Sequence, residues 1–509
     1  MQLSSVNGKY IGFFLGLGVF AIMMLLPVPE GMKPEAWKVA SVTALMAVWW
    51  ITDAIPIPAT GLIPIVLFPA LGVMSAKAAA APYADDVIYL FMGGFFLAVT
   101  MERWNLHRRV ALNTIKLVGA SPIRLVLGFM VATAFLSMWV SNSATAMMMV
   151  PIGLAVVAEV TGLTPSQIKE GSMEAGKSDL NFGRCLMLGI AFAASIGGLA
   201  TIIGTPPNAI LVAQVKTMYG YTITFFDWLL FGFPLAVITL FVTWLLLTKF
   251  IFPTGQFRMG DAGGVIDDEI AMLGPITKQE KAIMLVATCM AFLWIISGFV
   301  FKHFESLKMI KDSTIAIGGA VILFAWPVDL KKGKFLLDWK TGVKIPWDVV
   351  LLFGGGLAIA NGFMKTELTH YIAQQFVSLA GLHVYLLLTL ITIFTIALTE
   401  VTSNTATATL LVPIMGAVAL AMGINPLGPM VTAAIAASYA FMLPVATPPN
   451  AVAYGSGCFT IKDMALAGMW INLACFIIIP VVLYTCIPLF WGENLNVTPE
   501  WALNPPAAP

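Results

Sequence analysis

Charged side chains are scarce in this sequence, and their scarcity excludes most classes of soluble protein. Asp, Glu, Lys and Arg make up only 10% of the 509 residues, whereas hydrophobic residues make up 59%. A soluble domain typically carries about 25% charged residues. The mean hydropathy of +0.91 and the recurrent apolar runs of about 20 residues therefore indicate an integral membrane protein with many spans.

The residue patterns of several other functions are also missing. The five cysteines form no CxxC pair and the four histidines lie far apart, so neither a disulfide framework nor a Cys/His metal site is indicated. No GxxxxGK[ST] motif supports ATP-driven pumping. The net charge of +1 provides no basic surface for nucleic acid. No Ser/His, paired-carboxylate or HExxH arrangement supports an intramembrane enzyme, so we expect the protein not to be an enzyme.

Apolar segments long enough to cross a bilayer recur along the whole chain. Nine of them are predicted as spans, at residues 11–28, 36–55, 58–74, 86–101, 223–250, 280–300, 313–329, 347–363 and 464–490.

The sequence does contain a duplicated set of polar motifs inside these apolar runs. VSNSATAMMMVPIG at 140–153 and TSNTATATLLVPIM at 402–415 are identical at eight of fourteen positions, 262 residues apart. The same offset relates LFMGGFFLA at 90–98 to LFGGGLAIA at 352–360, and TPPNA occurs at both 205–209 and 447–451. Because each half carries the three motifs in the same order, the chain is predicted to contain an internal repeat.

The distribution of basic residues indicates that the two copies cross the membrane in opposite directions. Lys and Arg follow the first Gly-rich span, as in WNLHRR at 104–109, but precede the second, from Lys331 to Lys344. Since basic residues collect in cytoplasmic loops, this predicts inverted repeats with a cytoplasmic N-terminus and an external C-terminus. Lys302, Lys308 and Lys311 disagree, because this topology places them outside.

The duplicated motifs are predicted to interrupt helices at membrane depth. Thr-Pro-Pro-Asn removes two backbone donors, and broken backbone is tolerated there only when it is buried in protein or lines a cavity. The arms at 123–140 and 144–160 predict a helical hairpin that turns back at 141–143. Arms at 384–402 and 406–422 predict a second hairpin that turns at 403–405.

Oxygen-rich side chains, rather than charges, characterise these motifs. The windows 137–151, 195–209, 399–413 and 441–455 contain no Lys, Arg or His, and Glu400 is their only ionisable residue. Hydroxyls, amides and freed carbonyls suit a hard cation such as Na⁺, while helix N-termini and amide donors suit an anion. The alternative is that Ser, Thr and Asn only hold helices together and that Pro-Pro only kinks a helix. Duplication of both motifs favours one shared site.

Isolated charged residues have simpler interpretations. Glu400, whose counterpart in the first half is Met138, is interpreted as a structural partner, with a functional role left open. Asp53 is interpreted as structural or interfacial, and the Arg108–Arg109 pair as a topology anchor.

The doubled motifs and WNLHRR resemble the divalent anion/sodium symporter family, which includes di- and tricarboxylate and sulfate transporters. The resemblance extends from about Trp49 to Pro480. It implies an all-α fold of eleven transmembrane helices plus two re-entrant hairpins, in an elevator-type homodimer in the inner (plasma) membrane. Residues 1–121 and 256–382 would form the scaffold, and residues 122–255 and 383–509 would form the transport domain.

The resemblance also implies a set of binding residues. One Na⁺ site would use Ser137, Ser141, Asn142 and backbone near Gly197, and the other would use Thr399, Thr402, Ser403, Asn404 and backbone at Ala446. The dianion would contact Asn142, Ser143, Asn404 and Thr405, with Thr205, Pro206, Thr447 and Pro448 close by.

One departure from the family pattern concerns the first tripeptide, which ends in Ser143 where members commonly have Thr. This substitution leaves Na⁺ binding in place and makes the substrate uncertain among dicarboxylate, citrate and sulfate. Two hairpin tips suit a two-ended substrate such as succinate, so Na⁺-coupled symport of a C4-dicarboxylate is the preferred hypothesis. An exchanger without Na⁺ coupling is the alternative. An ion channel is disfavoured, because a channel needs a continuous polar lining.

Overall fold

The fold is that of an all-helical protein built around long apolar helices. In this computed structural model, residues 6–119, 121–162, 177–254, 262–301, 304, 306–307, 309–375 and 381–503 are described. Nine helices in this described part are long and apolar enough to span a bilayer. Further apolar helices are shorter, including Pro122–Ser137, Asp312–Ala325, Val384–Thr399 and Leu427–Ala436.

The first half of the chain begins with paired helices and ends with the first set of motifs. Its α-helices are α1 (Val6–Leu25), α2 (Pro34–Thr52), α3 (Ile57–Thr60), α4 (Ile63–Ala70), α5 (Ala76–Ala80), α6 (Asp86–Arg103), α7 (Leu106–Val118), α8 (Pro122–Ser137), α9 (Asn142–Thr161), α11 (Lys177–Gly198), α12 (Pro206–Tyr219) and α13 (Phe225–Leu245). Short helices η1 (Ala81–Ala84), η2 (Ile202–Gly204) and η3 (Leu246–Ile251) join or extend them.

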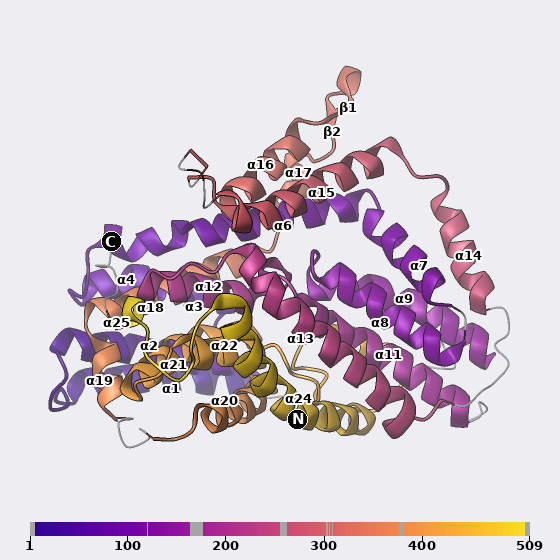
Figure 1. Ribbon diagram of the computed structural model, residues 1–509. Helices are drawn as coiled ribbons and strands as arrows, with labels where there is room; N and C mark the ends of the chain where they lie inside the picture. The colour runs from indigo at the N-terminus through magenta and orange to yellow at the C-terminus, as the bar shows by residue number, and fades with distance from the viewer. Residues whose placement is uncertain are drawn as a thin grey trace.

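The second half repeats this order after a connecting helix. It contains α14 (Ala262–Leu273), α15 (Lys278–Phe299), α16 (Asp312–Ala325), β1 (Pro327–Asp329), η5 (Leu330–Lys332), β2 (Lys334–Phe335), α17 (Trp339–Gly342), α18 (Trp347–Lys365), α19 (Leu368–Gln375), α20 (Val384–Thr399), α21 (Asn404–Ala421), α22 (Leu427–Ala436), α23 (Pro448–Tyr454), α24 (Ile461–Cys486), η7 (Ile487–Trp491) and α25 (Glu500–Leu503). The strands β1 and β2 pair antiparallel at one edge of the molecule (Figure 1).

Most predicted spans coincide with helices, but the third does not form a single helix. The segment predicted at 58–74 is divided between α3 and α4, with Gly61 between them. A Cβ at Gly355 of α18 would lie 2.3 Å from Gly61 O, so the break lies where α18 crosses it. The Gly-rich span therefore serves close helix packing, and Gly93 of α6 does the same against Ala316 of α16.

At each of the two predicted hairpins, two helices are joined by a short turn. Helices α8 and α9 are joined by residues 138–141, and α20 and α21 by residues 400–403. The α8–α9 unit packs on α11, and α20 packs on α22 and α24 (Figure 1). Each unit therefore lies against the helix that precedes the Thr-Pro-Pro-Asn motif of its own half.

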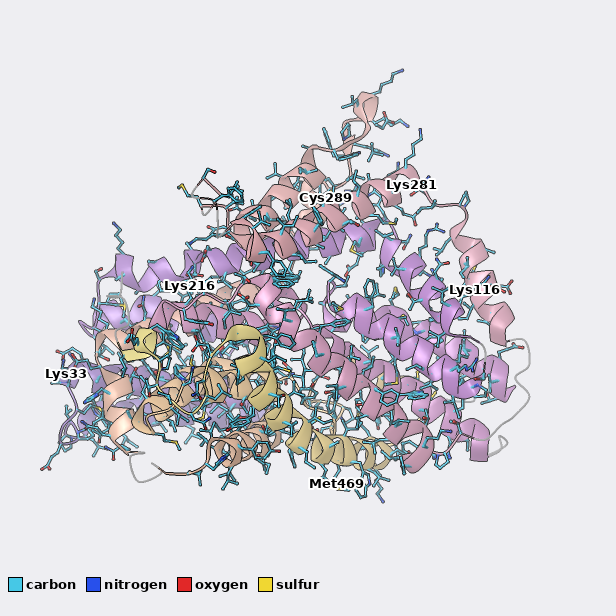
Figure 2. The ribbon with its side chains drawn as sticks, in the orientation of Figure 1. Lys33, Lys116, Lys216, Lys281, Cys289 and Met469 are labelled. Atoms are coloured by element: carbon cyan, nitrogen blue, oxygen red, sulfur yellow. The ribbon has the colours of Figure 1, made fainter. Side chains whose placement is uncertain are left out.

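The Arg108–Arg109 pair holds two helices together. Arg108 pairs with Glu269 of α14, and Arg109 Nε lies 2.6 Å from Glu280 Oε1 at the start of α15. Lys116, labelled in Figure 2 beside α14, pairs with Asp267. Arg109 also donates to the carbonyls of 273 and 274, at the C-terminal end of α14. These arginines thus fasten α7 to α14 and α15.

Two further charges identified in the sequence also have local partners. Asp53, in a left-handed conformation after α2, pairs with Lys9 of α1, which fits its structural interpretation. Lys311, which disagreed with the predicted topology, lies 3.5 Å from Asp86 of α6. Lys302 and Lys308 lie outside the described residues.

Candidate functional site

The first hairpin turn is fixed by its own Ser-Asn sequence. Ser141 is the N-cap of α9, with an extended ψ of 142°, and its Oγ accepts a hydrogen bond from Ala144 N at 3.3 Å. Ser is a favoured N-cap because its hydroxyl satisfies an orphan helix donor. Asn142 is consequently the first helical residue, and its side chain faces the end of α8 and the segment that follows α11.

Oxygen atoms from four parts of the chain meet at this turn. Ser137 Oγ donates to Ala194 O at 2.7 Å, and the Asn142 side-chain amide lies 2.6 Å from the same hydroxyl. With the amide oriented so that its oxygen does not face acceptors, Asn142 Nδ2 donates to Ser137 Oγ, Ala194 O and Gly204 O, at 2.6 to 3.2 Å. Hydroxyl, amide and carbonyl groups therefore converge at this turn. We call these four residues the first oxygen cluster.

The second hairpin turn carries an equivalent arrangement. Thr399 Oγ1 lies 2.7 Å from Asn404 Oδ1 and 2.7 Å from Ala437 O, and its one proton can be donated to either oxygen. Thr399 stands where Ser137 stands in the first half, and both are completely buried. We call Thr399, Asn404 and Ala437 the second oxygen cluster. Hydroxyl, amide and carbonyl oxygens are the ligand types that Na⁺ requires, so both clusters fit the predicted cation.

The backbone that breaks each helix is held by the asparagine of Thr-Pro-Pro-Asn. Asn208 Nδ2 donates to Gly198 O at 3.1 Å and to Thr201 O at 2.8 Å. Asn450 Nδ2 donates to Ala440 O at 2.9 Å and to Leu443 O at 3.0 Å. We name these breaks the first interruption (residues 199–205) and the second interruption (residues 437–447).

Asn208 and Asn450 were not among the binding residues predicted from the sequence. Their role depends on carbonyls seven and ten residues upstream, which become reachable only when the helix unwinds. The sequence did contain a signal for them, because asparagine is the fourth residue of the doubled Thr-Pro-Pro-Asn motif. Only the threonine and the first proline of that motif were predicted to bind substrate.

The helix after each interruption packs against the opposite half of the protein. Helix α12 packs on α21 of the second hairpin, and α23 packs on α9 of the first hairpin and on α11. Gln214 Nε2 of α12 donates to Thr409 O of α21 at 3.2 Å. The four motif copies therefore lie in one interleaved unit, not in two separate ones.

Glu400 is buried at the second hairpin turn and reaches the second interruption. Its carboxylate accepts from Phe441 N at 2.9 Å and from Met442 N at 3.0 Å. It also accepts from Asn472 Nδ2 of α24 at 3.0 Å. We call the hydrogen bonds that join a hairpin turn to its interruption the tie. In the first half the side chain of the tie comes from the interruption, because Thr201 Oγ1 donates to Met138 O of the hairpin at 2.7 Å.

The structure places the other predicted residues around these clusters with different partners. Thr402 Oγ1 bonds Leu398 O and Thr407 Oγ1, and Ser403 is the N-cap residue of α21 without a side-chain cap bond. A Cβ at Gly197 would lie 2.2 Å from Ala134 O, so this glycine permits α11 to touch α8. Gly198, not Gly197, adjoins Asn142. Ala446 N bonds Leu443 O within the second interruption.

The predicted substrate residues occupy helix starts on the same unit. Thr205 and Thr447 are the N-cap residues of α12 and α23, and Thr447 Oγ1 accepts from Asn450 N at 3.4 Å. Pro206 and Pro448 are the first residues of those helices. Ser143 and Thr405, the third residues of the two tripeptides, are both half-buried in the first turns of α9 and α21.

Comparison with known proteins identifies relatives over nearly the whole chain. The model of the sodium:sulfate symporter transmembrane region matches residues 7–495. The sodium-dependent dicarboxylate transporter SdcS of Staphylococcus saprophyticus is 41% identical over 96% of this chain and 93% of its own length. SdcS of Staphylococcus aureus is 42% identical over the same shares. The family resemblance predicted from the motifs is therefore confirmed.

Two solved structures share the fold at low sequence identity. MtrF of Neisseria gonorrhoeae, described as representing a class of antimetabolite efflux pumps, superposes with a TM-score of 0.57 at 13% identity, covering 95% of this chain and 94% of its own. The YdaH transporter of Alcanivorax borkumensis gives a TM-score of 0.56 at 12% identity, covering 96% and 98%. At these identities the likeness concerns the fold alone.

Proposed function

The chain belongs to the sodium:sulfate symporter family, and from this premise we propose that it moves a C4-dicarboxylate such as succinate across the plasma membrane together with Na⁺. It is thus a secondary active transporter and not an enzyme. The relatives named as sodium-dependent dicarboxylate transporters support both the coupling ion and the substrate class.

The observation that carries this proposal is the pair of oxygen clusters in one interleaved unit. Each cluster joins a buried hydroxyl, an asparagine amide and a backbone carbonyl without a basic residue. Such oxygens fit a hard monovalent cation far better than an anion. In the proposed assignment, each cluster binds one Na⁺, with Ser141, Thr402, Ser403 and backbone near Gly197 and Ala446 completing the two ligand sets.

In the proposed assignment, the anion binds between the two tripeptides. Helices α9 and α21 begin at Asn142 and Asn404, so their N-terminal amides and positive dipole ends are available to carboxylates. One carboxylate would meet Asn142 and Ser143, and the other would meet Asn404 and Thr405. Thr205, Pro206, Thr447 and Pro448 would close the site, and the two Na⁺ ions would offset the charge of the dianion.

The transport cycle in this proposal is an elevator movement of residues 122–255 and 383–509 against a scaffold of residues 1–121 and 256–382. A boundary between these parts is supported by side-chain pairs that join them. Lys216 of α12 pairs with Asp86 of α6 and lies 3.9 Å from Asp85. Lys216 is labelled in Figure 2. Asp312 Oδ2 of α16 accepts from Phe225 N of α13 at 2.7 Å.

A cavity of about 410 Å³ lies at the same boundary, lined by Asp86, Lys216, Thr224 and Asp312 among others. Polar contacts at such a boundary can be exchanged at a low free-energy cost, as a sliding boundary requires. The scaffold would form a homodimer, the N-terminus would be cytoplasmic and the C-terminus external, and the two helical hairpins would be re-entrant.

The alternative is a dicarboxylate, citrate or sulfate exchanger on the same fold without Na⁺ coupling. Uptake of radiolabelled succinate into proteoliposomes distinguishes the two, with an inward Na⁺ gradient and then with K⁺ or choline in its place. The symporter predicts uptake only with Na⁺, competed by unlabelled succinate. Uptake that needs internal dicarboxylate and ignores Na⁺ would make the protein an exchanger, and the clusters would then be structural.

A further inference from the structure

The two half-sites differ by one buried charge. Glu400 directly follows Thr399 of the second oxygen cluster, whereas the residue that follows Ser137 of the first cluster is Met138. Glu400 is only 6% exposed, which is unusual for a carboxylate. A buried charge in a membrane protein is expensive and most often has a function.

Burial and hydrogen bonding act on Glu400 in opposite directions. Burial disfavours the carboxylate anion, whereas its hydrogen-bond partners among the described residues are donors that favour it, namely two backbone amides of the second interruption and the amide of Asn472. Donors of this kind stabilise a carboxylate anion. Within the part of the chain that the structure describes, the ion pairs of Lys and Arg go to other carboxylates and none reaches Glu400. Its negative charge is therefore not neutralised by a neighbouring cation of the protein.

The charge lies close to the second oxygen cluster because both are fixed on the same two segments. Thr399 bonds Ala437 O and Glu400 bonds the amides of 441 and 442, all in the second interruption. With adjacent Cα atoms 3.8 Å apart, the Thr399 hydroxyl and the Glu400 carboxylate lie within about 11 Å of each other. At that distance and an effective dielectric constant of about 20, a unit charge changes a cation's binding constant on the order of tenfold.

We propose that Glu400 is a fixed negative charge that raises the Na⁺ affinity of the second oxygen cluster above that of the first. It acts on Na⁺ through space, as a positioning and specificity residue, and is not a ligand. The inference rests on the proposed function, because it takes the clusters to be Na⁺ sites. It predicts that the second cluster fills at lower Na⁺ concentration than the first.

The substitution Glu400→Gln removes the charge with little change of shape. The Gln Oε1 can still accept from the two backbone amides. It can also accept from Asn472 Nδ2, because all three donors reach the same oxygen, Oε1, in Glu400. The hydrogen bonds between hairpin and interruption therefore survive. The variant thus tests the effect of the charge without removing those hydrogen bonds.

The experiment measures Na⁺ binding directly, without transport. The purified protein is titrated with NaCl at constant ionic strength, with choline replacing Na⁺, and the rise in melting temperature is followed. For Glu400→Gln we expect the half-saturating Na⁺ concentration of the second site to increase on the order of tenfold. In uptake assays the half-saturating Na⁺ concentration should rise similarly, while the succinate KM at saturating Na⁺ stays within about twofold of wild type.

Two further variants keep the outcome decisive. Glu400→Gln combined with Asn472→Asp moves the charge to a side chain 3.0 Å away and should restore most of the Na⁺ affinity. Met138→Leu, the matched control in the first half, should change nothing. An unchanged Na⁺ midpoint in Glu400→Gln, or a loss that the double variant does not rescue, overturns the inference. If wild type itself shows no Na⁺ effect, the proposed function fails instead, and this inference falls with it.

Discussion

The two halves of this protein carry the same motifs but join hairpin and interruption in opposite ways. In the first half, the interruption supplies the side chain, because Thr201 Oγ1 donates to Met138 O. In the second half, the hairpin supplies it, because the Glu400 carboxylate accepts from the amides of 441 and 442. Both halves share the oxygen cluster of a hydroxyl, an asparagine and a backbone carbonyl. Both also share the hydrogen bonds from the asparagine of Thr-Pro-Pro-Asn to carbonyls near or within its interruption, which we call the asparagine clamp.

The contacts shared by both halves are those that the proposed site needs, and the contacts that differ are those that each half can vary. In the proposed function, these two copies of one arrangement each bind one cation. The tie that holds the arrangement in place can be built in more than one way. Substitutions in the shared parts should therefore act equally in both halves, and substitutions in the ties should act in one.

The largest expected effect comes from the shared asparagines. Asn142→Ala and Asn404→Ala should each abolish Na⁺-driven succinate uptake, because each removes a cluster oxygen and a substrate contact together. Uptake by proteoliposomes measures this, with monodisperse elution in detergent as the control for folding. If one variant kept near wild-type uptake, the two half-sites would not be equivalent.

The asparagine clamps should give the next largest loss. Asn208→Ala and Asn450→Ala each remove two buried hydrogen bonds and leave two carbonyls unpaired, which costs about 2–4 kcal/mol. We expect a similar drop in melting temperature and a severe loss of uptake in both variants. A loss in only one half would show that its counterpart is held by other contacts.

The sequence predicted the architecture of these halves better than their contacts. Repeated Ser-Asn and Thr-Pro-Pro-Asn predicted turns at 141–143 and 403–405, and the structure has turns at 138–141 and 400–403. The split of the third span at Gly61 was missed, because it follows from the approach of Gly355 in a distant helix. The clamp carbonyls of Asn208 and Asn450 were missed for a similar reason, since side-chain type alone does not show which backbone atoms are left free.

The tie in the first half should matter less than the clamps. Thr201→Val keeps the shape and removes the bond to Met138 O, which is worth about 1 kcal/mol with some penalty for the unpaired carbonyl. We expect the maximal uptake rate to fall severalfold. Leu443→Val, at the corresponding position of the second half, is the control and should be silent. An equal loss in both variants would mean that the hydrogen bond to Met138 O is not the cause of the loss.

Only the first half has a long helix after its interruption, and that helix carries a boundary contact. Helix α12 has 14 residues and α23 has 7, so only α12 brings a lysine, Lys216, to Asp86. The pair is about one-quarter to one-third exposed, so Lys216→Met should shift the balance between transporter conformations by up to about fivefold. Cysteine accessibility at the 410 Å³ cavity measures this shift. Unchanged accessibility would remove the pair from the conformational cycle.

The smallest effect is expected where the two tripeptides differ. Ser143→Thr makes the first tripeptide identical to the second, and the equally half-buried Thr405 shows that such a position accommodates the methyl group. Transport should remain within about twofold of wild type, since substitutions at partly exposed sites away from strained or buried features cost little. Competition by succinate, citrate and sulfate checks whether selectivity changes. Complete loss of uptake would mean that the first half requires the smaller side chain.

The proposed mechanism depends on two cation sites that bind Na⁺ together with one dianion. The number of Na⁺ ions moved with each succinate tests this most directly, from the Na⁺ gradient at which net succinate flux into proteoliposomes reverses under a fixed succinate gradient and a membrane potential clamped at zero. At least two Na⁺ ions per dianion is the result that two working oxygen clusters predict. A ratio of one, or a succinate flux that does not depend on the Na⁺ gradient, would contradict the proposed mechanism, since one or both clusters would then only hold the hairpins in place.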